Sequence, residues 1–180
     1  MLSSTRGQLL VASPDLDDPN FRRTVVLVIA HDADGALGVV INRPTDISVG
    51  EALVEWEGVA SEPACLHAGG PVEPDSAVAL GVGPPDPTGS SPGGIVGLMG
   101  TVDLDGRPDD YRAVRVFVGY SGWGGGQLDS EIARGDWIVV DATVGDLTTA
   151  ASESLWRDVL RRQRGRVAMF ATASEDPTLN

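Results

Sequence analysis

The chain has 180 residues, 42% of them hydrophobic, and its longest apolar run, 25–30, is far shorter than the ~20 residues of a membrane-spanning helix. Its formal net charge of −13 opposes the phosphate neutralisation on which nucleic-acid affinity depends, so direct DNA binding is disfavoured. All the basic residues are arginine, which excludes lysine-based mechanisms such as Schiff bases and the Walker A loop.

The composition shows no break that would separate two cores, so a single domain over residues 1–180 is expected. Residues 1–10 lack the pattern of a signal peptide. Cys65 is the only cysteine, which fits a reducing compartment. Both features predict a cytoplasmic protein.

Short β-branched, apolar runs bounded by Pro, Asp and Gly predict strands along most of the chain. Asp34-Gly35 predicts a hairpin between the second and third strands, with a loop of about five residues. A short helix is expected at 49–56, because Ser48 and Glu51 match a capping box. The predicted strands are residues 8–12, 24–30, 36–41, 64–67, 77–82, 95–98, 113–118 and 137–141.

Two further helices are expected at residues 127–134 and 147–163. The second carries Arg161, Arg162 and Arg164 at its C-terminal end, where cations complement the helix dipole. Residues 83–94, rich in Pro, Gly and Ser, predict an exposed loop. Strands come first and helices follow without strict alternation, which indicates an α+β fold rather than a doubly wound parallel sheet.

The segment GYSGWGGGQLDSEI at residues 119–132 is the most distinctive stretch. Its glycines predict a tight loop, in which Tyr120 and Trp123 either anchor the core or form the wall of a ligand site. Ser121 nearly completes a nucleophile elbow, but Trp123 replaces the second glycine and both histidines precede the serine. A nucleotide site is a further alternative, although the G-x-G-x-x-G register is absent.

Polar residues follow or precede several predicted strands. They either hydrogen-bond the backbone freed where Pro44 and Pro71 stop their strands, or converge with the 119–126 loop on one cleft. In such a cleft an arginine would pair with a carboxylate or phosphate, and a free helix start near 125–127 would favour the same charge. Because sheets gather such turns at one end, we expect one concave ligand site. Its predicted residues are Arg23, Asn42, Arg43, Gly70, Tyr120, Trp123 and Gln127.

No complete catalytic, metal or cofactor set is present in the sequence. The segment 31–35 lacks the later ligands of a calcium loop. His31, Cys65 and His67 do not make a zinc quartet, and a lone cysteine in an apolar strand is interpreted as packing. We therefore assign no catalytic residue, metal or cofactor.

Four motifs resemble the AlgH/YqgE family of bacterial proteins. They are GQLLVASPDLDDPNFRRTVV, GALGVVINRP, GGPV and GYSGWGGGQLDSEIARGDW, at residues 7–26, 35–44, 69–72 and 119–137. The resemblance implies a compact α+β fold whose mixed, strongly curved β-sheet closes into a pseudo-barrel with flanking helices. It implies no biochemical function: members are often labelled transcriptional regulators, and the fold is not a known DNA-binding one.

These observations favour a non-enzymatic module that binds a small anionic ligand or a protein partner and regulates indirectly, without a membrane. The alternative is a hydrolase or transferase that uses a cleft near residues 119–127. A direct DNA-binding regulator ranks third, because the acidity of the chain opposes it.

Overall fold

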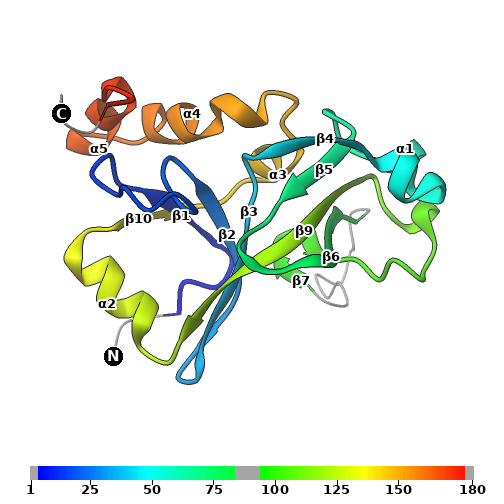
Figure 1. Ribbon diagram of the computed structural model, residues 1–180, viewed down its shortest axis with the longest axis horizontal. Helices are drawn as coiled ribbons and strands as arrows, with labels where there is room; N and C mark the ends of the chain where they lie inside the picture. Colours follow the sequence, from blue (N-terminus) through cyan, green and yellow to red (C-terminus); the bar gives the residue numbers. More distant parts are fainter. Residues whose placement is uncertain (1–3, 84–93, 177–180) are drawn as a thin grey trace.

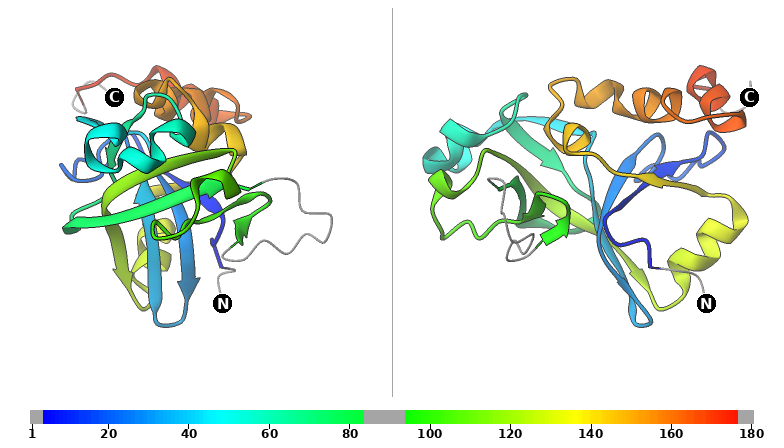
Figure 2. Two further views of the ribbon diagram at one scale, coloured as in Figure 1. Left: turned by 90° about the vertical axis from the view of Figure 1, so that its right-hand side faces the viewer. Right: turned by 180° about the vertical axis from the view of Figure 1, so that it is seen from behind.

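A computed structural model describes residues 4–83 and 94–176. A ten-stranded sheet, strongly curled into a half-barrel, carries the fold, and helices flank it (Figures 1 and 2). Its strands are β1 (Gln8–Ala12), β2 (Val25–Asp32), β3 (Gly35–Val40), β4 (Pro44–Ser48), β5 (Cys65–Ala68), β6 (Val72–Val82), β7 (Gly94–Val96), β8 (Met99–Thr101), β9 (Ala113–Gly124) and β10 (Trp137–Asp141).

The strands are ordered β10-β1-β2-β3-β9-β6-β8-β7, and β5 branches from β9 with β4 at its side. β5 runs parallel to β9, whereas the other strand pairs are antiparallel, so the sheet is mixed. The predicted α+β class and the mixed, strongly curved sheet are thus confirmed.

The helices lie on several sides of this sheet. α3, α4 and α5 form a row along one side, α2 lies apart from them, and α1 follows the end of β4 (Figures 1 and 2). Their bounds are α1 (Val49–Ala52), α2 (Gln127–Arg134), α3 (Val144–Thr148), α4 (Leu155–Arg161) and α5 (Arg166–Met169). Short 3-10 helices lie at Val54–Val59, Pro108–Asp110, Ser152–Ser154 and Phe170–Thr172. None of the helices in the described part of the chain is long and apolar enough to cross a membrane.

The first strands are buried on both faces. Leu9 and Val11 of β1 belong to the core cluster that contains Val159 of α4. Leu10, between them, points the other way and shares a second cluster with Leu128 of α2. Because apolar residues are needed on both faces, these strands read as continuous apolar runs instead of alternating ones.

β9 corrects the prediction of a glycine loop at 119–126. The strand continues to Gly124, and its last residues pair with β3, with Trp123 opposite Ala36 and Ser121 opposite Gly38. Its earlier residues pair with β6, so one long strand joins the two halves of the sheet (Figure 1). The glycines serve close strand packing, and the tight turn is confined to the two residues before α2.

Several boundaries differ from the prediction. The capping box of Ser48 and Glu51 is confirmed, but α1 ends at Ala52 and a 3-10 helix follows. Two residues, not five, separate the paired ends of the β2–β3 hairpin. Pro44 begins β4, a strand that the sequence did not predict; a proline is tolerated there because the first residue of a strand can lack a ladder donor. The expected loop at 83–94 falls almost entirely outside the described residues.

The long helix predicted at 147–163 is wrong: α3 ends at Thr148 and α4 begins at Leu155. The carbonyl of Thr149 accepts a hydrogen bond from Arg115 Nη2 at 3.0 Å, so it is taken by a tertiary contact instead of a helical one. The apolar stripe in the sequence does not reveal this competition for the Thr149 carbonyl, because the competition depends on Arg115, which lies in β9.

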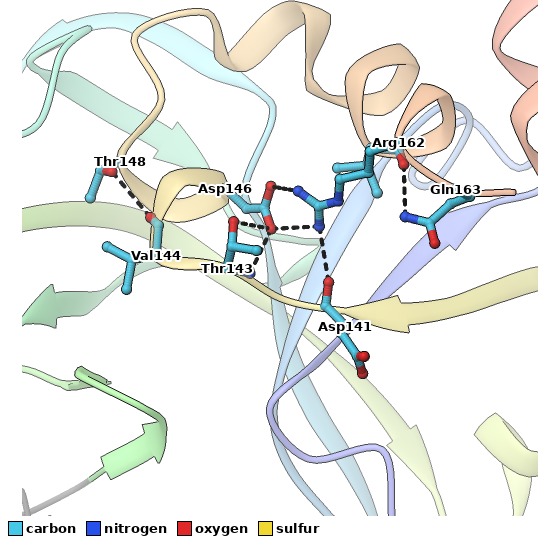
Figure 3. A network of polar contacts seen from close by, with 8 residues as sticks. Asp141, Thr143, Val144, Asp146, Thr148, Arg162 and Gln163 are labelled. Atoms are coloured by element: carbon cyan, nitrogen blue, oxygen red, sulfur yellow. Dashed lines mark hydrogen bonds and ion pairs between the residues drawn. The ribbon is translucent and has the colours of Figure 1, made fainter.

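A polar network fixes the two helices relative to each other (Figure 3). Asp146 Oδ2 accepts the backbone N–H of Thr143 at 2.7 Å, which caps α3, and the guanidinium of Arg162 at 2.8 Å. Arg162 also donates to the carbonyl of Asp141 at 2.9 Å. The arginine expected as a solvated cation at a helix end therefore ties α4 to α3 and β10.

Candidate functional site

Asn42 follows β3, and its side chain positions the backbone at the start of β2. Its side chain is nearly buried, with 8% exposure. Its Oδ1 accepts the N–H of Val25 and its Nδ2 donates to the carbonyl of Arg23, both at 2.9 Å. Arg23 has φ +54°, a conformation that costs a non-glycine residue free energy and is often kept at functional sites. The side chain of Asn42 thus holds Arg23 in a strained turn.

The side chain of Arg23 is held without a carboxylate. Its guanidinium carbon lies 4.5 Å from the ring centroid of Trp156, and its Nη2 donates to the carbonyls of Ala173 and Ser174. Desolvation by burial, followed by the nearby charge of Arg157, lowers the pKa of Arg23. These contacts orient the cation, and the charge of Glu175 acts on the pKa of Arg23 in the opposite direction.

Arg43 has the same kind of environment. Its Nη1 donates to the carbonyl of Asn20 at 2.6 Å, and its Nη2 donates to those of Pro19 and Arg22 at 3.3 and 3.1 Å. Desolvation lowers the pKa of Arg43, while Asp18 acts in the opposite direction. Arg43 therefore shapes the 19–22 loop and brings a second cation to the same region.

These side chains line two adjoining hollows. The first, named the arginine hollow, has a volume of about 540 Å³ and is lined by Pro19, Arg22, Arg23, Arg43 and Glu175. The second, named the middle hollow, has about 490 Å³ and is lined by Arg23, Asn42, Arg43, Pro44, Ala68 and Glu153. Arg23 and Arg43 belong to both, so the two hollows are neighbours.

The arginine hollow concentrates positive charge on an acidic protein. Within residues 4–83 and 94–176, none of Arg22, Arg23 and Arg43 forms an ion pair. Glu175 is the one carboxylate among the lining residues. Three arginines that line one hollow without an ion pair in the described ranges provide charge-assisted donors for an anion.

The predicted site residues do not all come together. Arg23, Asn42 and Arg43 meet at the middle hollow, but Gly70, Tyr120, Trp123 and Gln127 line neither it nor the arginine hollow. Gly70 packs against the backbone of Tyr120, whose ring packs partly buried on the main core. The middle hollow thus brings together three of the seven predicted residues, and neither hollow includes the other four.

Trp123 and Gln127 instead belong to a network around Glu131. The indole N–H groups of Trp123 and Trp137 both donate to Glu131 Oε2 at 2.8 Å. Gln127 donates to Glu131 Oε1 at 3.0 Å and accepts the N–H of Gly124 at 3.1 Å. Asp129 lies in the first turn of α2 and Glu131 follows in the next turn, so the start of α2 is negatively charged and does not favour an anion.

Ser121 has no access to a substrate. It is 0% exposed, and its hydroxyl donates to the carbonyl of Gly69 at 3.1 Å. We expect Ser121→Ala to lower the free energy of unfolding by about 1 kcal/mol, the value of one buried hydrogen bond. Urea unfolding measures that change. A fluorophosphonate probe should leave the unaltered protein unlabelled; labelling that the substitution abolishes would contradict the structural role.

A second polar cluster lies at β5 and β9, and it brings together residues whose relation the sequence did not predict. His67 is 0% exposed, and its Nδ1 lies 3.1 Å from the carbonyl of Cys65. Because a carbonyl only accepts, Nδ1 carries the proton and Nε2 accepts from the hydroxyl of Ser152 at 3.2 Å. Burial, then the charge of Arg115, lowers the pKa of His67 to about 4, so the ring is neutral. The sequence signal that could have revealed this cluster was Arg115, a charged residue inside an otherwise apolar strand.

No group of three or more His, Cys, Asp or Glu side chains in the described ranges is arranged to hold a metal ion. What the described site offers chemically is a set of guanidinium donors around an open depression.

Comparison with known proteins places this chain in a family. The AlgH-like family model matches residues 9–168, and the chain belongs to that family. The UPF0301 protein SCO2948 of Streptomyces coelicolor is 48% identical, with 99% of this chain and 97% of that protein covered. A UPF0301 protein of Thermobifida fusca is 49% identical, with 98% and 96% covered.

Two solved structures share the architecture. Protein DIP2367 from Corynebacterium diphtheriae superposes with a TM-score of 0.88 at 30% identity, covering 95% of this chain and 93% of that one. The AlgH protein from Pseudomonas aeruginosa gives a TM-score of 0.66 at 25% identity, covering 98% and 100%. The predicted membership of the AlgH/YqgE family is thereby confirmed.

Proposed function

We propose that this protein is a non-enzymatic cytoplasmic binding module that takes a small anionic ligand, or the anionic group of a protein partner, in the arginine hollow. The observation that carries the proposal is the convergence of Arg22, Arg23 and Arg43 around one depression, without an ion pair in the described chain. Because the net charge of the chain is −13, such a local cationic site is unusual for this chain, and an anion is attracted to this position and not to the acidic surface.

Carboxylate and phosphate are the groups that such donors fit. Guanidinium groups form bidentate, charge-assisted hydrogen bonds with both, and a volume of about 540 Å³ suits a small metabolite. Direct DNA binding remains disfavoured by the net charge, and two arginines of the 157–166 stretch are engaged with Asp158 and Asp146.

The test begins with a thermal-shift screen of carboxylates, phosphates and nucleotides. Binding to the folded state alone raises the melting temperature, so a hit identifies the class of anion. Arg43 is a poor probe, since its removal would free three loop carbonyls and destabilise the loop. Arg22 is better: it lines the hollow, and no side-chain hydrogen bond of Arg22 is found among the described residues.

We expect Arg22→Ala to weaken binding of a hit by about 1 to 3 kcal/mol, because a charge-assisted bond is lost, and to leave the unliganded melting temperature unchanged. Isothermal titration calorimetry measures the affinity. Arg164→Ala is the matched control: Arg164 is exposed, does not line the hollow, and its loss removes the same charge. Equal effects of both substitutions, or no anion hit in the screen, would remove the support for this site.

A further inference from the structure

The middle hollow carries charges of both signs on its walls. Arg23 and Arg43 supply the positive charges, and Glu153, in the 3-10 helix between α3 and α4, supplies the negative one. Glu153 is exposed, and within residues 4–83 and 94–176 no ion pair joins it to either arginine. The opposite charges therefore line one space of about 490 Å³ without a salt bridge of the chain between them.

The negative charge continues into a third hollow, named the acidic hollow. It has a volume of about 410 Å³ and shares Pro44 and Glu153 with the middle hollow. The charged residues among its described lining residues are Asp46 and Glu153, both exposed. The arginine hollow instead shares Arg23 and Arg43 with the middle hollow. The charge of the walls thus changes from positive to negative along three neighbouring hollows.

The neighbours of Glu153 in the chain fix its position. Ser152, directly before it, is 1% exposed, and its hydroxyl donates to Nε2 of the buried His67 of β5 at 3.2 Å. Nη2 of Arg115 in β9 donates to the carbonyl of Thr149, at the start of the same connection, at 3.0 Å. Both contacts tie the α3–α4 connection to the sheet. The backbone that carries Glu153 is therefore already ordered before a ligand binds, which lowers the cost of binding.

Charges of opposite sign around one hollow select a ligand of complementary charge. A guanidinium group binds phosphate or carboxylate through charge-assisted hydrogen bonds. A carboxylate attracts an ammonium group and repels a second anionic group, so it discriminates between ligands that the arginines alone would accept. The net charge of −13 adds to the repulsion of a ligand with several negative charges.

We propose that the site takes a small zwitterion, whose phosphate or carboxylate group contacts Arg23 and Arg43 while its ammonium group lies against Glu153. This inference rests on the proposed function, because it names the class of ligand for the same arginines. The arginines supply affinity for the anionic group, and Glu153 determines specificity for the amine. Asp46, in the acidic hollow, adds to the attraction for the ammonium group within the screening length of the solution.

The test compares ligands that differ only in the ammonium group. The probes are aminoethyl, aminopropyl and aminobutyl phosphate, each set against the alkyl phosphate of the same chain length. The three lengths sample the separation between the arginines and Glu153, and a parallel series sets aminocarboxylates against plain carboxylates. At about pH 8 the phosphates are dianionic and the amines are protonated. NMR titration of isotope-labelled protein at low ionic strength measures each dissociation constant.

We expect the best amino compound to bind about three- to fivefold more tightly than its counterpart without the amine, the range for one solvent-exposed ion pair. Attraction to the arginines alone would give the opposite order, because the ammonium group reduces the net negative charge of the ligand. Glu153→Gln should bring this ratio to about one, without weakening the binding of the plain anion. The variant should fold, since the side chain is exposed and forms no ion pair in the described ranges.

Glu55→Gln is the matched control, because Glu55 is exposed, lines none of the three hollows, and loses the same charge. It should keep the ratio of the unaltered protein. Equal affinities within every pair, a ratio that survives Glu153→Gln, or a ratio that Glu55→Gln lowers as much would overturn the zwitterion proposal alone. If no member of either series binds, the proposed anion site loses its support and the zwitterion proposal is overturned with it.

Discussion

The substitution Gly70→Ala is expected to lower the free energy of unfolding by about 4 kcal/mol, which is a large part of the stability of a typical domain. Gly70 has φ +152°, a region that side chains rarely enter. A Cβ at this position would lie 2.2 Å from the carbonyl oxygen of Tyr120 and 2.3 Å from its carbonyl carbon. Both atoms belong to the backbone of β9, whose pairing with its neighbours prevents it from moving away.

Urea denaturation of the two proteins measures this difference. Gly58→Ala is the matched control, because a Cβ added at Gly58 meets no atom within 4 Å and its backbone is not in the left-handed region. We expect the control to stay within about 0.5 kcal/mol of the unaltered protein. If Gly70→Ala were as mild as the control, the GGPV motif would need an explanation other than close packing against β9.

The strands were the best predicted part of the fold, for a local reason. β1 and β10 begin and end as predicted, since each is a short apolar run with turn residues at both ends. α2 was also predicted with its bounds, because the glycines before it and Gly135 after it mark both ends. In these segments the neighbouring residues alone decide where the element starts and stops.

The errors arise where a distant residue decides the local structure. The glycine segment after Val118 looked like a loop because strands seldom contain so many glycines, yet pairing with β3 extends β9 through it. The α3–α4 break depends on Arg115, more than thirty positions away in the chain. Neither contact leaves a local pattern, so propensity and periodicity could not reveal it.

The candidate site was predicted only in part, again because contacts between distant segments decide which residues meet. Arg23, Asn42 and Arg43 lie at neighbouring ends of β2 and β3, so their proximity follows from the predicted hairpin. Gly70, Tyr120, Trp123 and Gln127 were grouped with them on the assumption of one loop cluster, but β9 carries its aromatic residues away into the core. A further hollow was missed because its lining residues come from three separate segments, 44–46, 63–65 and 150–153.

Replacing the buried histidine should make the protein more resistant to acid. The pKa of His67 is about 4 in the folded protein, against 6.5 for an unperturbed histidine. The unfolded chain therefore binds a proton that the folded chain does not, and stability is lost as the pH falls from about 6.5 towards about 4. Above about 6.5 the ring is neutral in both states and contributes no such loss.

This linkage sets the size of the expected effect. By about pH 5 the cost of keeping His67 neutral reaches about 2 kcal/mol, and by about pH 4 it approaches 3 kcal/mol. His67→Gln should lose some stability at about pH 7, because the amide replaces an oriented ring between Cys65 and Ser152. The variant should then lose less than the unaltered protein on acidification, since glutamine binds no proton.

Urea denaturation of both proteins at about pH 7 and about pH 5 measures the change. Both chains carry the same carboxylates, so the difference between them isolates the histidine. We expect the gap in unfolding free energy to shift in favour of His67→Gln by about 2 kcal/mol over this interval. A gap that stays constant, or a His67 ring that titrates near 6.5 by NMR in the folded protein, would show that this histidine is charged inside the fold and that the Arg115 charge does not reach it.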